Sequence, residues 1–200
     1  MRPSFALLLS AFLFWGPGAK SLWAEESPFA PEDHCLAYRA TKKMFLLADV
    51  AVYGKSCEVQ ARMEVQDAQV RFLVSAPVAS LDSGSRMRDN SVQEILRAEE
   101  HPDLKFTSAW LPEKQVREVA REEGRLEVNG VLEVAGKFYG MIFDLQVEPQ
   151  SGYALITGVK ETRFSALELV VPQVIGGVVA KPGDELQIHL HLRTDRIPGF

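Results

Sequence analysis

The chain has 200 residues, of which 46% are apolar and 24% charged, enough for one domain with a sizeable core or at most two small ones. Its formal net charge of −5, from 22 basic and 27 acidic residues, excludes general nucleic-acid binding, which relies on basic side chains against phosphate. The Lys and Arg residues also form no run of the kind that holds acidic lipid headgroups.

Residues 1–24 differ in composition from the rest of the chain. Arg2 gives a positive start, residues 5–15 (FALLLSAFLFW) are almost purely apolar, and Ala24 precedes two glutamates. This is the order of a secretory signal peptide, and the apolar run is shorter than the roughly 20 residues that a membrane-spanning helix needs. We therefore expect a signal peptide at 1–24 and a periplasmic or secreted domain at 25–200. An uncleaved membrane anchor is the alternative.

Export decides how the two cysteines, Cys35 and Cys57, are interpreted. In an oxidising compartment a lone pair of cysteines is more often a disulfide than a metal or catalytic site. A crosslink closing a loop of this size stabilises by roughly 3 kcal/mol in the chain-entropy description. We predict a Cys35–Cys57 disulfide, with two buried free thiols as the alternative.

Alternation of apolar and polar residues runs through most of the mature chain and predicts strands with one dry and one wet face. A less regular extended segment comes first, at 38–53. The alternating segments are 58–66, 69–76, 103–110, 125–134, 137–148, 153–164 and 185–193. Glycine- and proline-containing turn signals separate several of them. This makes about eight strands without the spacing of βαβ units.

One stretch, 91–100, has the spacing of a helix instead. Val92, Ile95 and Leu96 fall on one helical face, Asp89 precedes them as a candidate N-cap, and Pro102 follows as a stop. The predicted fold is therefore all-β: an antiparallel β-barrel of about eight strands with one short helix inserted between strands.

Residues 79–108 (ASLDSGSRMRDNSVQEILRAEEHPDLKFTS) resemble the central signature of YceI-like proteins. The matching features are a pair Asp82-Ser83, a pair Arg88-Asp89 opening a short helix, then Pro102 and Phe106-Thr107-Ser108. Segments 126–136, 162–165 and 183–186 also resemble the family, whereas Ser91 and Ala135 stand where many members have histidine. The resemblance implies a lipocalin-like barrel, commonly periplasmic, which in some members binds a polyisoprenoid in a long apolar channel.

A barrel of about eight strands encloses room for packed side chains or for one slim apolar ligand. Each methylene that such a ligand buries is worth roughly 0.8 kcal/mol, so an apolar tunnel needs no catalytic group, metal or cofactor. We expect an isoprenoid or fatty lipid as the bound partner. Its predicted contacts are Phe72, Val74, Arg88, Phe106, Trp110, Tyr139, Met141, Phe143, Leu145 and Phe164. The alternative is that these side chains fill the barrel themselves.

Three features of the sequence, namely Arg88, the apolar segment 170–179 and the pair His189 and His191, each allow a structural and a functional interpretation. Arg88 either ties a loop to the barrel rim or meets a polar headgroup at the channel mouth. The apolar segment 170–179, which contains two glycines, either packs under the barrel, covers one end as a lid, or faces a membrane or partner. His189 and His191 share one strand face, which we expect to be solvated rather than metal-binding.

Sequence motifs of the common enzyme classes are missing: the chain has no G-x-S-x-G, H-E-x-x-H or Walker A sequence. We therefore expect a non-catalytic protein. The leading hypothesis is a lipid carrier or sequestering protein, and the alternative is a periplasmic interaction or stress-associated module with a filled barrel. Transient contact with the membrane or an envelope protein, and a homodimer, stay open as further partner hypotheses.

Overall fold

One antiparallel sheet dominates the computed structural model, which describes residues 27–44, 50–172 and 180–200. Its strands are β1 (Cys35–Met44), β2 (Val50–Ser56), β3 (Gln60–Gln66), β4 (Gln69–Pro77), β5 (Asp103–Ser108), β6 (Leu111–Pro112), β7 (Gly124–Val134), β8 (Lys137–Pro149), β9 (Ala154–Arg163) and β10 (Ala180–Arg193). The predicted signal peptide at 1–24 lies outside the described residues.

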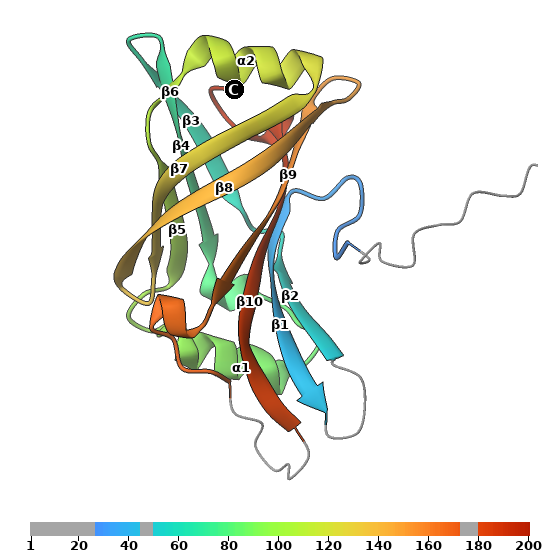
Figure 1. Cartoon of the computed structure of the whole chain (residues 1–200), viewed down its shortest axis with the longest axis vertical. Coiled ribbons are helices and arrows are strands. Elements are labelled where there is room, and N and C mark those ends of the chain that lie inside the picture. Colours follow the sequence, from blue (N-terminus) through green and yellow to red (C-terminus); the bar gives the residue numbers. More distant parts are fainter. Residues whose placement is uncertain (1–26, 45–49, 173–179) are drawn as a thin grey trace, which may run out of the picture.

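The strands pair in the order β2-β1-β10-β9-β8-β7-β5-β4-β3, and the short β6 pairs with β4. The sheet curls round on itself (Figure 1), which confirms the antiparallel, lipocalin-like fold. Two details differ from the prediction. The irregular segment 38–53 belongs to two strands, so there are more strands than predicted. The barrel is also not closed, because no ladder pairs β2 with β3 in the described part of the chain. The β2 edge makes only one isolated bridge there, between Lys55 and Asp82.

The free edge of β3 is covered in part by the last residues of the chain. The backbone N–H of Met63 donates a hydrogen bond of 2.8 Å to the carbonyl of Pro198. A Cβ on Gly199 would come within 2.3 Å of the Met63 carbonyl oxygen, so the tail lies directly against the strand. The seam between β2 and β3 is thus bordered by non-strand segments on both sides.

Alternation along the strands places most of the apolar side chains inside, as the pattern predicted, although Val65, Ile142 and Val159 are exposed. On β4, Val70 and Ala76 are fully buried. On β7 and β8, Val128 lies opposite Phe143, and the ladder runs without a break from Gly124–Val147 to Val134–Lys137. Ala135 and Gly136 join these two strands with positive φ angles of 50° and 76°, as a tight hairpin turn requires.

The first helix, α1 (Arg86–Ile95), begins earlier than the sequence predicted. Ser85 takes the N-cap position, so the prediction that Asp89 caps the helix is wrong. Asp89 lies in the first turn, and its Oδ1 accepts hydrogen bonds from the backbone N–H and the hydroxyl of Ser83, at 3.0 Å and 2.5 Å. The carboxylate therefore fixes the loop before the helix.

A second helix, α2 (Glu113–Glu122), corrects the prediction of a single helix. Val116 is buried, and Val119 and Ala120 pack partly against the same core. The two helices lie at opposite ends of the curled sheet (Figure 1). Short 3₁₀ helices occur at Val78–Ser80, Ser165–Leu167 and Thr194–Arg196. Among the described residues, no helix combines the length and apolarity needed to span a bilayer.

Candidate functional site: an apolar cavity inside the curled sheet

The interior contains a cavity of about 410 Å³ beside α1. Strands supply most of its wall, including Tyr38 of β1, Val74 of β4 and Leu190 of β10, and α1 adds Val92 and Ile95. Small-molecule sites in proteins commonly enclose about 300–1,000 Å³ and are lined mainly by apolar side chains. In size and lining this cavity suits a small apolar ligand.

A much smaller cavity of about 50 Å³ lies toward α2. Val116 of α2 and Phe200 at the carboxyl end contribute to its wall, and every residue that lines it is apolar. The α2 half of the interior is otherwise filled by a core cluster that includes Val70 and Leu126. The interior is therefore hollow beside α1 and nearly filled beside α2.

Five of the ten predicted contact residues line the larger cavity, and two more line only the smaller one. The first group is Val74, Arg88, Phe106, Phe143 and Phe164, and the second is Phe72 and Leu145. Ligand contact at these positions stays a prediction. Tyr139, Met141 and Trp110 line neither cavity.

The three residues outside both cavities have other partners. Tyr139 donates a hydrogen bond of 2.6 Å to the carbonyl of Leu167, and Met141 is buried in the cluster that contains Phe164. The Arg71 guanidinium lies 4.8 Å from the centre of the Trp110 ring. Strand β5 ends at Ser108, so the alternation that predicted an inward Trp110 does not extend to that residue.

Polar groups gather where α1 meets the cavity. Arg88 borders the cavity and is exposed, and its Nη2 donates a hydrogen bond of 2.8 Å to the Ser83 carbonyl. Its Nε lies 3.2 Å from the Ser83 hydroxyl. Arg88 thus joins α1 to the loop that precedes it. Contact of Arg88 with a ligand headgroup stays a prediction.

Tyr38 contributes a phenol to the cavity wall close to Arg88 and Asp89. Burial and the Asp89 carboxylate raise the pKa of Tyr38, so its hydroxyl is neutral at physiological pH. Gly54 of β2 makes room for the ring, because a Cβ there would lie 2.2 Å from a Tyr38 ring carbon. The phenol is a neutral hydrogen-bonding group beside an apolar wall.

Several lining residues were not among the predicted contacts. Met87, Ser91, Val92 and Ile95 lie on α1, and the apolar face of Val92 and Ile95 was visible in the sequence without any sign that it faces a cavity. Strand β1 also contributes lining side chains, although its irregular pattern concealed them. The proposed lid at 170–179 lies mostly outside the described residues; Pro172 lines the cavity and Val170 is 67% exposed.

The prediction of a solvated histidine face on β10 is wrong. His189 and His191 are only 8% and 7% exposed. The segment before β1 lies against this face: the Phe29 ring is 5.2 Å from that of His191, and His191 Nδ1 is 3.0 Å from the Asp33 carbonyl oxygen. A contact so distant in sequence leaves no trace in local alternation.

His34 is also buried, and its Nδ1 accepts a hydrogen bond of 3.0 Å from the Arg193 backbone N–H. Burial, reinforced by the positive charge of Arg196, lowers the pKa of His34. The imidazole is therefore neutral in the folded protein at physiological pH.

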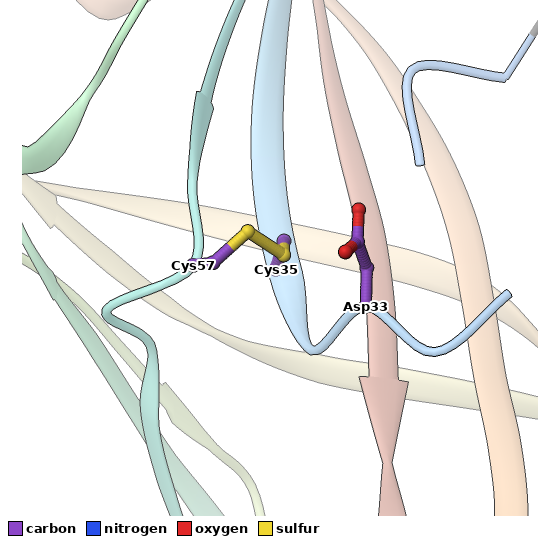
Figure 2. A group of neighbouring side chains, drawn as sticks. All are labelled: Asp33, Cys35 and Cys57. Carbon is purple, nitrogen blue, oxygen red and sulfur yellow. A yellow bond between two sulfur atoms is a disulfide. The ribbon is translucent and has the colours of Figure 1, made fainter. Parts of the chain in front are cut away.

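Cys35 and Cys57 form a disulfide that joins the start of β1 to the residue after β2 (Figure 2). Cys35 is fully buried and Cys57 is exposed. Asp33 lies beside them, and its carboxylate is within 4.8 Å of both sulfur atoms. Sulfur atoms bonded to each other are not thiolates and offer no strong metal ligand.

The Asp33 carboxylate already has partners of its own. Lys55 Nζ and the Ala30 N–H each lie 3.0 Å from Oδ2. Burial by itself raises the pKa of Asp33, but these two donors and the lysine charge together hold it below its usual value. Asp33 therefore acts as an anchor for the segment that covers β10.

A curled antiparallel sheet around an apolar cavity, with a helix at each end, defines a lipocalin-like protein. The YceI-like domain matches residues 36–194, and the chain belongs to that family. This confirms the resemblance carried by residues 79–108. No curated protein sequence matches the chain.

Several solved structures resemble the fold, and three of them illustrate the range. BcnA from Burkholderia cenocepacia has a TM-score of 0.57 at 21% identity, over 80% of this chain and 95% of that one. A polyisoprenoid binding domain from Saccharophagus degradans has a TM-score of 0.59 at 10% identity, over 79% and 92%. The YCEI protein of Campylobacter jejuni has a TM-score of 0.53 at 16% identity, over 76% and 88%.

Proposed function

We propose that this protein binds the apolar chain of an isoprenoid or fatty lipid in the larger cavity and carries or sequesters it without catalysis. The observation that carries the proposal is the cavity of about 410 Å³, lined mainly by apolar side chains. A related fold from Saccharophagus degradans, described as a polyisoprenoid binding domain, supports the same ligand class.

The affinity comes from burial of the chain. Each methylene that leaves water contributes roughly 0.8 kcal/mol, so about ten methylenes supply about 8 kcal/mol before the costs of association. Arg88 and Ser91 at the α1 rim give a polar headgroup a place to lie. A ligand with one polar end and a long apolar tail matches this distribution of groups.

A role outside the cytoplasm is part of the proposal. The Cys35–Cys57 disulfide supports it, because structural disulfides persist mainly in oxidising compartments. The composition of residues 1–24 supports export independently.

An interaction module with a side-chain-filled barrel is the second candidate. The filled half of the interior beside α2 favours it, because side chains there leave only about 50 Å³. The larger cavity beside α1 argues for the lipid carrier, and the two candidates differ in whether that cavity is occupied in the purified protein.

Mass spectrometry of an organic extract of the purified protein tests the proposal, together with melting temperatures measured with added isoprenols. We expect a co-purified lipid, or a melting temperature that rises with isoprenol concentration. Ser91→Trp places a large ring in the cavity wall and should abolish both signals. Glu94→Trp, on the same helix but outside the wall, is the matched control. Absence of both signals in the unmodified protein contradicts the carrier function.

A further inference from the structure

The larger and the smaller cavity share part of their walls. Phe106 of β5 and Phe143 of β8 line both, together with Val74, Leu190 and Leu192. The two phenylalanine rings are in contact, with centroids 5.2 Å apart and planes at 83°. An apolar chain that entered from the α1 side would therefore meet these rings, here called the ring pair, before it reached the smaller cavity.

The backbone fixes the position of the ring pair. Gly130 of β7 faces the interior beside Phe106, and a Cβ on Gly130 would lie 2.3 Å from Phe106 Cζ. The Phe106 ring thus occupies space that any other residue at position 130 would take. Phe143 pairs with Val128 in the β7–β8 ladder and is only 5% exposed. Edge-to-face contact is a preferred arrangement of aromatic rings, because the positive edge of one ring meets the negative face of the other.

We infer that the ring pair is a stop that sets the length of apolar chain this protein accepts, an inference that rests on the proposed function. A chain shorter than the distance from the α1 rim to the ring pair gains affinity with every added methylene. A longer chain must leave its extra methylenes in water or displace the rings. Affinity therefore stops rising at one chain length, and the ring pair determines that length.

Removing either ring should join the two cavities. In Phe106→Leu or Phe143→Leu, the smaller cavity becomes an extension of the larger one, and longer chains gain further burial. Two other phenylalanines offer the same substitution elsewhere. Phe72 lines the smaller cavity only, and Phe164 lines the larger cavity only, so Phe72→Leu and Phe164→Leu leave the junction intact.

The test measures Kd for saturated straight-chain alcohols that differ in steps of two methylenes, by displacement of a fluorescent apolar probe from the full-length protein. Affinity should rise by up to about fifteenfold per step while the chain is still being buried, and then level off. In Phe106→Leu and Phe143→Leu, the chain length at which affinity stops rising should be greater. In Phe72→Leu and Phe164→Leu, this chain length should stay within one step of its value in the unmodified protein.

A structure of the unmodified protein with the longest alcohol that binds gives a readout that needs no variant. We expect the terminal methyl against the ring pair. Two results overturn the inference while the binding function stands. One is an alcohol chain that passes into the smaller cavity. The other is an affinity that stops rising at the same chain length in the unmodified protein and in both Phe106→Leu and Phe143→Leu. If no alcohol binds the unmodified protein, the proposed function fails as well.

Discussion

Replacing both cysteines in Cys35→Ala/Cys57→Ala should lower the free energy of unfolding by about 3 kcal/mol. The crosslink spans a sequence separation of 22, and the entropy of closing a loop of that length gives this value at 25 °C. The folded state should change little, because the neighbouring pair Leu36–Ser56 already belongs to the β1–β2 ladder. A loss of this size is a large part of the stability of an ordinary domain, about 5–15 kcal/mol.

Equilibrium urea unfolding measures the loss. The midpoint should fall, and the dependence on urea should steepen, because an unfolded chain without the crosslink exposes more surface. Oxidised protein, the same protein after full reduction, and the double variant form the comparison, with the last two expected to agree. Unfolding free energies of oxidised and reduced protein that agree within about 0.5 kcal/mol refute the reasoning, since the linear extrapolation resolves a larger difference.

Three further predictions concern individual residues. Gly130→Ala should cost about 1–3 kcal/mol of stability because the new Cβ would lie 2.3 Å from Phe106 Cζ and 2.5 Å from the Thr107 carbonyl oxygen, whereas Gly140→Ala, with no atom within 4 Å of the new Cβ, should cost much less; urea midpoints compare them. Asp89→Ala should lower stability by about 1–3 kcal/mol through the two lost hydrogen bonds to Ser83, and an unchanged midpoint counts against that role. Because burial lowers the pKa of His34, the unfolded state takes up the proton first as pH falls, so stability should decline from about pH 6.5 down to the lower folded pKa. His34→Asn should flatten this part of the curve of unfolding free energy against pH, and a parallel curve contradicts the assignment.

The antiparallel sheet could be predicted because alternation is a local property of each strand. On β8 the alternate residues Met141, Phe143 and Val147 are all buried, as their spacing required. Helix α2 was not predicted, because only three of its ten residues are apolar and most of the others are charged. The apolar residues are Val116, Val119 and Ala120. Their spacing of three and four residues was nevertheless a usable signal.

The site was harder to predict than the fold, because it depends on which inward side chains meet across the sheet. Sequence identified Phe106 and Phe143 as inward-facing, but only strand order and the space left by Gly130 bring their rings together. The buried histidines show the same limit, since His191 is covered by Phe29 from a segment far away in sequence.

The hydrogen bond from Met63 to Pro198 has a consequence for how the protein behaves at high concentration. An uncovered edge strand presents a row of backbone donors and acceptors on which another chain can add a strand. Residues 198–200 occupy part of that row on β3, and Phe200 packs against Phe72 beneath it. By covering these groups, residues 198–200 oppose the addition of a strand from a second copy of the chain at the β3 edge.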